Sequence, residues 1–450
     1  MLIHIAKKEA LEHLRSFRFV VAFIFIIATF CIMMFIRHFE YKSKYDDYLL
    51  RIKAQEEALE KYASHANYAI FAEPIVPPSQ MGVIVDPSVR DTITQSGRSL
   101  DDNPVDSINI KLDIITLVGM LGSLLALLLS YDSVNREVNE GTVRLLLSSG
   151  IPRIKIISGK ILGGSLAATL PIAIVFLLTS IWLAVADGQG FGPNQWTSLL
   201  GILGVSVIYI MFFYCLGALV SSVILDHTLS ALSCFGVWIL FIVIVPVMSP
   251  YVAKSLVTVP SQGAMRREQD FVNWELSQEY TRQERALVAQ GLSEADAREK
   301  LTPEFEQRVE TIRDKFVAMV EDYKNAAAWQ VKLSIRLACI SPYSVYSVAV
   351  EELSGQGSGH FPHVESLISN QRQQDDEFAN HQYDEALKRN PEFTILGKLD
   401  LSAMPRFKYI EPTVGYKYSH ALPYILLLSA YFLVLPFLFV YALYSKRRLF

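Results

Sequence analysis

The sequence predicts an all-α polytopic membrane protein with six transmembrane helices. Hydrophobic residues make up 51% of the 450-residue chain, and long apolar stretches without charged residues recur along it. Each stretch is close to or above the roughly 20 residues that a helix needs to cross a hydrocarbon core, whereas runs of about 10–14 are typical of buried helices in soluble proteins. The predicted spans are residues 19–36, 114–131, 161–186, 196–225, 229–248 and 421–444.

The first 18 residues predict an amphipathic interfacial helix that precedes the first span. Apolar and charged residues alternate at roughly helical spacing over 1–18, although an ordinary charged flank is the alternative. The run at 19–36 has a long positive flank and no small-residue cleavage site after it. We therefore expect a retained helix rather than a cleaved signal peptide.

Lysine and arginine in the short segments predict the orientation. The N-terminal flank, the 132–160 segment and the 445–450 tail are rich in these residues, while the connection at 187–195 has none. Positive residues favour the cytoplasmic side of a membrane. We therefore expect both termini and the 132–160 segment in the cytoplasm, with residues 37–113 and 249–420 outside.

The two external regions predict a mainly helical extracytoplasmic domain with some extended segments. Residues 37–113 open with a charged helical pattern and end in a proline-rich stretch. Within residues 249–420, apolar residues recur at helical spacing over 267–290 and 303–340. A further helical pattern follows, and the segment at 392–410 favours extended structure.

Several kinds of chemistry are disfavoured by the residues that the spans and loops contain. The span interiors hold no Asp, Glu, Lys, Arg or His, which ion-coupled carriers and intramembrane proteases need. His360 and His363 have a metal-like spacing but no third or fourth ligand nearby in the sequence, so we expect no metal site. Cys339 is alone in the external regions, which leaves no external disulfide framework. The net charge of −4 does not indicate a nucleic-acid partner.

The stretch ELSGQG at 352–357 is close to the LSGGQ signature of ABC ATPases. An ATPase also needs a phosphate-binding loop of the form GxxxxGK[ST], and the sequence contains none. We therefore expect ELSGQG to be a helix end followed by a glycine-rich turn. No catalytic residue is predicted.

The connection between the second and third spans predicts a helix that lies along the membrane surface. Val138 and Leu145 fall on one helical face, whereas the charged residues lie largely elsewhere. Gly141 breaks or tightens this helix, and Gly159-x-x-x-Gly163 lets the third span pack closely on a neighbour. A plain amphipathic connector would explain this periodicity but not the order of the residues.

That order resembles the cytoplasmic loop of ABC-2 type transporter permeases, in the subgroup with enlarged extracytoplasmic loops. In this family a Glu-containing stretch, Gly-Thr, a Leu-rich turn, a Pro/Arg step and Gly-Lys follow one another. The matching positions are Glu137, Gly141, Thr142, Leu145, Leu146, Leu147, Ser148, Arg153, Gly159 and Lys160. Val138 replaces the Arg that often follows the Glu, and Pro152 lies two positions later than in the common form.

The resemblance implies a permease subunit, not an enzyme, in the cytoplasmic (inner) membrane of a prokaryote. A cytosolic ATP-binding protein would bind ATP and Mg, so that this chain needs no cofactor of its own. A second permease copy would complete a homodimer or a related heterodimer. The helix within 132–160 would be the coupling helix that inserts into the ATPase. Its expected contact residues are Arg136, Glu137, Val138, Glu140, Gly141, Thr142, Arg144, Leu145 and Arg153.

The resemblance also implies a path between two permeases, and we expect Tyr209, Phe212 and Tyr214 either to line it or to pack in the core or against lipid. Spans without charge fit export of a hydrophobic or amphiphilic substrate, or conformational work on an extracytoplasmic accessory protein. A different class of function is a membrane-anchored sensor or scaffold without an ATPase. That alternative leaves the order of residues in 132–160 unexplained.

Overall fold

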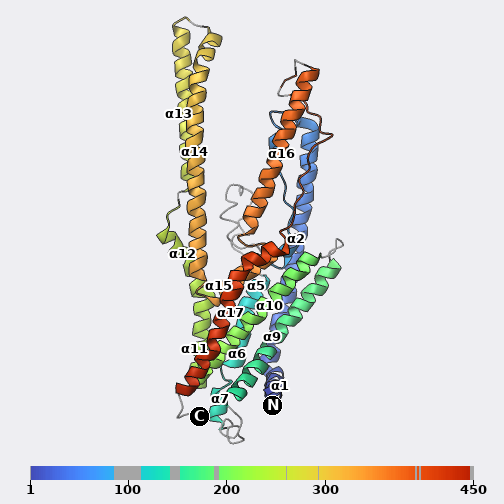
Figure 1. Ribbon diagram of the computed structural model, residues 1–450, viewed down its shortest axis with the longest axis vertical. Helices are drawn as coiled ribbons and strands as arrows, with labels where there is room; N and C mark the ends of the chain where they lie inside the picture. Colours follow the sequence, from blue (N-terminus) through green and yellow to red (C-terminus); the bar gives the residue numbers. More distant parts are fainter. Residues whose placement is uncertain are drawn as a thin grey trace. The chain divides into compact units, whose positions relative to one another are not determined.

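The computed structural model describes residues 2–85, 113–141, 153–186, 192–259, 261–291, 293–390, 393–394 and 397–445. Within these ranges the chain is helical and forms no strand, apart from an isolated bridge between Ser64 and Lys398. It divides into two units, of which one comprises Met1–Val243 with Ser341–Phe450 and the other comprises Ile244–Ile340 (Figure 1).

Among the described residues, six helices are long and apolar enough to cross a membrane. Their bounds are Phe17–Tyr62, Ile114–Asn139, Ser158–Ala184, Pro193–Val223, His227–Leu256 and Val414–Leu438. They agree in number and order with the predicted spans. The expected fold class, an all-α polytopic membrane protein, is therefore confirmed.

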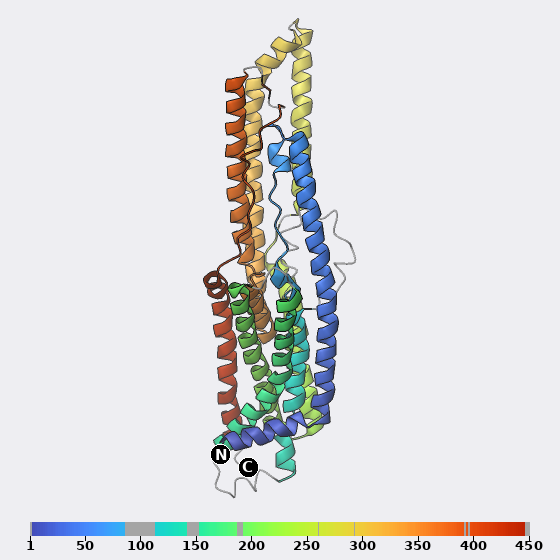
Figure 2. The same cartoon turned by 90° about the vertical axis from the view of Figure 1, so that its right-hand side faces the viewer.

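The N-terminal part of the chain forms two consecutive helices, α1 (Leu2–Leu14) and α2 (Phe17–Tyr62). Ser16 caps the start of α2, because its Oγ accepts a hydrogen bond from the backbone N–H of Phe19 at 3.2 Å. α2 is uninterrupted over 46 residues, which corresponds to about 69 Å at 1.5 Å per residue. The predicted first span and the charged helical pattern after it are thus parts of one helix (Figure 2).

The other spans of the first unit pack around α10 (Pro193–Val223), whose aromatic side chains Tyr209, Phe213 and Tyr214 are at most 1% exposed. Its neighbours are α6 (Ser123–Ser130), α9 (Arg153–Ala186), α15 (Pro342–Ser354) and α17 (Val414–Ser445). The span that ends in α6 begins as α5 (Ile114–Thr116) and passes through the π-helical segment η2 (Leu117–Gly122).

The second unit contains a long helical hairpin. α11 (His227–Ile239) of the first unit continues through the π-helical segment η3 (Leu240–Ile244) into α12 (Val245–Leu256), and the hairpin helices are α13 (Gln262–Ala289) and α14 (Glu294–Ala338). Arg308 on α14 binds Glu279 on α13 at 2.8 Å, and Gln330 donates a hydrogen bond to the carbonyl of Val257 at 2.7 Å. Residues late in α14 therefore lie beside residues early in the unit, as an antiparallel pair requires.

α15 ends as the sequence predicts. Gly355 follows it with a φ of 76°, a left-handed conformation that suits glycine, which confirms ELSGQG as a helix end followed by a turn. α15 is buried along most of its length and packs on α10 and α17. The predicted external region 249–420 is therefore divided, because Ile244–Ile340 forms the second unit whereas α15 belongs to the core of the first.

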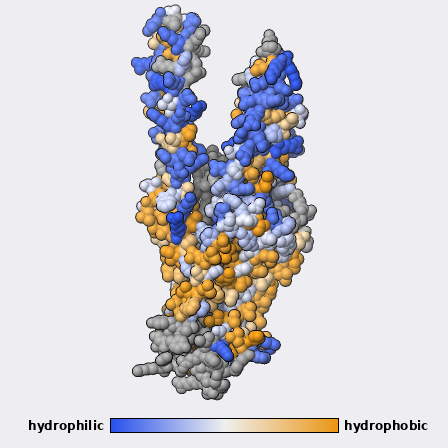
Figure 3. All heavy atoms as spheres, viewed as in Figure 1, coloured by the Kyte–Doolittle hydropathy of each residue, from blue (hydrophilic) through white to orange (hydrophobic). Residues whose placement is uncertain are grey.

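A small separate core lies under α16 (His360–Arg389), which packs against α3 (Tyr68–Phe71). Its buried members are Leu59, Ala63, Tyr68, Ala379 and Leu399. A short 3-10 helix, η1 (Gln80–Val83), follows α3 and contacts α2. Figure 3 shows hydrophobic side chains gathered over the spans of the first unit, and hydrophilic ones over α13, α14 and α16.

Candidate functional site

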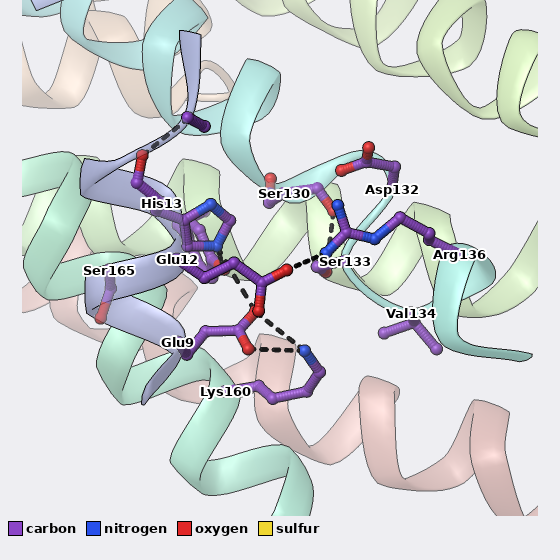
Figure 4. A network of polar contacts seen from close by, with 12 residues as sticks. Glu9, Glu12, His13, Ser130, Asp132, Ser133, Val134, Arg136, Lys160 and Ser165 are labelled. Carbon is purple, nitrogen blue, oxygen red and sulfur yellow. Dashed lines mark hydrogen bonds and ion pairs between the residues drawn. The ribbon is translucent and has the colours of Figure 1, made fainter. Parts of the chain in front are cut away.

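The candidate site lies where α1, α7 (Asn135–Asn139), α9 and α10 meet (Figure 4). α1 packs on the first turns of α9 over two glycines. A Cβ atom on Gly159 would lie 2.8 Å from Cγ2 of Ile5, and one on Gly163 would overlap the backbone carbonyl of Ala6. Side chains larger than hydrogen would push the helices apart. The neighbour that the Gly-x-x-x-Gly pattern predicts is therefore α1.

Lys160 on α9 is at the centre of the site, between carboxylates from two other helices. Its Nζ lies 2.7 Å from Oε2 of Glu9 on α1 and 2.9 Å from Oε1 of Glu137 on α7. The side chain of Lys160 is 11% exposed, that of Glu9 is 9% exposed and that of Glu137 is 19% exposed. With so little water available, Lys160 supplies a nearby counter-charge to both carboxylates.

His13 connects Glu9 to α10. Its Nε2 lies 3.4 Å from Oε1 of Glu9 and 3.1 Å from the hydroxyl of Tyr214. Burial raises the pKa of Glu9, but the hydrogen bond with His13 and the charge of Lys160 outweigh this effect, so the pKa of Glu9 is lowered overall. Glu9 therefore remains an anion at neutral pH.

Two further ion pairs join α7 and the segment before it to α1 and α2. Arg136 on α7 binds Glu12 on α1 (Figure 4). Arg18 at the start of α2 binds Asp132, between α6 and α7, at 2.8 Å. Both arginines are substantially exposed, so each pair adds only about 0–1 kcal/mol to stability. Their main effect is to hold α7 and the segment before it against α1 and α2.

The start of α7 is also attached to the last turn of α10. Oγ of Ser221 accepts hydrogen bonds from the backbone N–H groups of Val134 and Asn135, both at 3.1 Å. The side-chain amide of Asn135 donates to the carbonyl of Ile224 at 3.4 Å. These bonds satisfy N–H groups that a helix start leaves unpaired. α7 therefore cannot be displaced without disturbing contacts to α1, α9 and α10.

The structure brings two of the predicted contact residues, Arg136 and Glu137, into this network. Val138 is half-buried, while Glu140 and Gly141 are exposed at the end of α7. Gly141 has a φ of 74°, so the helix ends at the glycine that the sequence marks as its break. The described residues do not include Thr142, Arg144 and Leu145. They also leave out the side chain of Arg153, the first residue of α9. A contact with an ATPase stays a prediction for the whole set.

The aromatic residues predicted for a path are buried within the first unit. The hydroxyl of Tyr209 donates to the carbonyl of Gly119 at 2.8 Å, and its ring stacks on Tyr346 at a centroid distance of 4.4 Å. Phe212 is 5% exposed and Tyr214 is 1% exposed. This burial is typical of core packing in a single chain. A role in a path between two copies stays a prediction.

The residues that α1 contributes were not singled out from the sequence. Glu9, Glu12 and His13 recur at a spacing of three and four, which places them on one face of a helix. This polar face could have been found from the sequence, because the predicted amphipathic helix over 1–18 already has an apolar face on its other side. Ser221 offered no such signal, because a single serine in an apolar span is common.

Comparison with known proteins identifies a family for almost the whole chain. The family model described as "ABC-2 family transporter protein" matches residues 3–449. The chain is also similar to the "Probable ABC transporter permease protein NosY" of Stutzerimonas stutzeri, with 28% identity over 135 residues, which is 29% of this chain and 48% of that protein. The chain thus spans about half the length of this curated relative.

Proposed function

Because this chain belongs to the ABC-2 family of transporter proteins, we propose that it is the permease subunit of a complex driven by a separate ATP-binding protein. ATP and Mg bind to that protein, and this chain supplies the membrane spans. Two copies, or one copy with a related chain, assemble with two ATPases in the cytoplasmic membrane of a prokaryote. Both termini and α7 face the cytoplasm.

The observation that supports this function best is the attachment of α7 to three other helices. Glu140 and Gly141 leave the end of α7 exposed, while Glu137 binds Lys160 on α9 and Arg136 binds Glu12 on α1. An ATPase that engages the exposed end therefore moves a helix whose other contacts lie in the bundle. α7 acts as the coupling helix, and α1 moves with it.

The work done by the complex is export of a hydrophobic or amphiphilic substrate, or a change of shape imposed on an extracytoplasmic accessory protein. The apolar character of all six spans supports the first of these outcomes. The hydrophilic α13–α14 hairpin supports the second, because its polar surface suits a partner in water.

Co-purification with the ATPase tests the docking surface. Glu140→Lys reverses an exposed charge at the end of α7 without touching the Lys160 ion pairs. We expect this variant to retain much less ATPase than the wild type. Asp384→Lys, which reverses an exposed charge on α16, is the matched control and should retain it fully. Equal retention by the two variants would show that α7 does not dock the ATPase.

A further inference from the structure

We propose that a cavity beside α2 binds a phosphate group, carried by a membrane lipid or free in solution. The cavity has a volume of about 130 Å³. It lies between α2, the segment that leads into η1 and the turn that follows α15, all within the first unit. This site does not involve α7, so it goes beyond the coupling function proposed above.

Gln356, in the turn after α15, gives the cavity an unused hydrogen-bond donor. The residue is 8% exposed, and its Nε2 donates to no group among the described residues. Its backbone N–H donates to the carbonyl of Glu351 at 2.9 Å, which fixes the turn. A buried amide without a partner costs free energy, and a ligand oxygen in the cavity would remove that cost.

The charged residues of the cavity favour an anion. Arg37 is 5% exposed and is held in place by Glu40 at 2.7 Å and by the carbonyl of Gly82. Lys44, one turn beyond Glu40, adds a second positive charge at the exposed side of the cavity. The lining therefore carries two positive charges and one negative charge. A surplus of positive charge raises the local concentration of anions.

The size and the position of the cavity identify the group that it accepts. A volume of about 130 Å³ is below the range of about 300–1,000 Å³ that drug-sized ligands occupy. Arg37 is the first charged residue after the apolar run 19–36, so the cavity lies where the hydrocarbon core ends and the headgroups begin. Positively charged side chains at this level attract the phosphate group of a lipid headgroup.

Melting of the purified full-length protein in detergent tests the site. Short-chain phosphatidylglycerol should raise the melting temperature of the wild type, whereas diacylglycerol with the same chains should not. In Lys44→Glu the half-saturating lipid concentration should rise about fivefold or more. Lys42→Glu, an exposed α2 residue that does not line the cavity, should behave as the wild type. Inorganic phosphate with the same dependence on Lys44 would support the site and assign it to a free anion. Equal protection by diacylglycerol would overturn the proposal.

Gln356→Met separates ligand binding from a structural role. Because the side-chain Nε2 of Gln356 has no hydrogen-bond partner among the described residues, methionine should leave the melting temperature of the ligand-free protein unchanged or higher. The stabilisation by phosphatidylglycerol should be lost. A ligand-free protein that melts lower, with its lipid response intact, would show that Gln356 serves the fold and not a ligand.

Discussion

Lys160 joins side chains that are far apart in the sequence. Its ammonium group contacts both oxygens of Glu9, at 2.8 and 2.7 Å, and one oxygen of Glu137, at 2.9 Å. These three oxygens match the three protons that a lysine donates. Breaking such a group by removing one member is costly, because the charges left behind remain largely buried.

We expect Lys160→Met to lower the free energy of unfolding by about 3 kcal/mol, since Glu9 and Glu137 then lose their shared counter-charge. Lys155→Met makes the same change at an exposed position of α9 and should have little effect. Chemical unfolding of both variants in detergent measures the difference. Equal stabilities would contradict the structural role of Lys160.

Asp375 on α16 makes the stability of the core around α3 depend on pH. Its side chain is buried near Tyr68 and accepts a hydrogen bond from Gln371 at 3.1 Å. Burial raises its pKa from the ordinary value of 3.8 to about 6, and the nearby charge of Asp376 acts in the same direction. Because the pKa of Asp375 is higher in the folded state than in the unfolded state, protonation of Asp375 favours folding. This contribution to the free energy of unfolding is complete below about pH 4 and is lost as the pH rises through about 6.

Asp375→Asn removes this titration while preserving the shape of the side chain. We expect the variant to be more stable than the wild type at pH 8, and the difference to shrink towards pH 4. Melting temperatures at the two pH values provide the measurement, with Asp384→Asn, at an exposed position of α16 away from Asp375, as the control. A stability difference that does not change with pH would argue against a raised pKa at Asp375.

At the same scale, the sequence predicted only part of the site. Glu137 and Lys160 were found through the family resemblance, but their pairing was not predicted. Glu9 lies 151 residues before Lys160, and their contact depends on how α1 folds back over Gly159 and Gly163. Spacing along the chain carries no information on such a contact.

At the scale of elements, the spans follow from the apolar runs because length and composition decide whether a helix can cross a bilayer. The first span was predicted to end at residue 36, with a separate charged helical pattern after it. In the structure α2 continues to Tyr62, and no Gly or Pro interrupts residues 37–62. The π-helical segments η2 and η3 have no signal in the sequence. Such segments are rare and occur mostly as single turns inside α-helices.

The position of α15 could not be inferred from its composition. Glu351 and Glu352 made burial in the first unit unexpected, yet both are buried. Ser347 donates a hydrogen bond to Glu351 at 3.1 Å, and Ser358 donates one to Glu352 at 2.7 Å. Buried carboxylates are tolerated when they have such partners, and these partners become visible only in three dimensions.

The packing of α1 on α9 yields a prediction at the same scale. Gly163→Ala should destabilise the protein by about 1–3 kcal/mol, because the new methyl group meets the backbone carbonyl of Ala6. Gly204→Ala on α10 is the control, since its methyl group would meet no atom within 4 Å. Tryptic cleavage after the exposed Lys7 and Lys8 should be faster in the first variant only. Unchanged cleavage would mean that α1 does not depend on this contact.

At the scale of the whole molecule, the α7 site and the phosphate cavity both belong to the first unit, whereas the α13–α14 hairpin forms most of the second. The family match extends over both units. Membership of the family thus shows that the chain is a membrane subunit of a transporter. The residues of the apolar spans do not identify its substrate. Charged groups that would select a polar substrate do not occur in the interiors of the predicted spans.

The most direct test of coupling through α7 is an environment-sensitive fluorophore on Lys8→Cys in α1, in a protein whose exposed Cys31 is replaced by serine. In the reconstituted complex, ATP should change the fluorescence when Lys160 is present. In Lys160→Met combined with Glu9→Gln and Glu137→Gln, which removes both ion pairs of Lys160 without leaving either carboxylate charged, the ATPase should still co-purify but ATP should cause a much smaller change. A response equal to that of the wild type would contradict transmission of ATPase movement through Lys160.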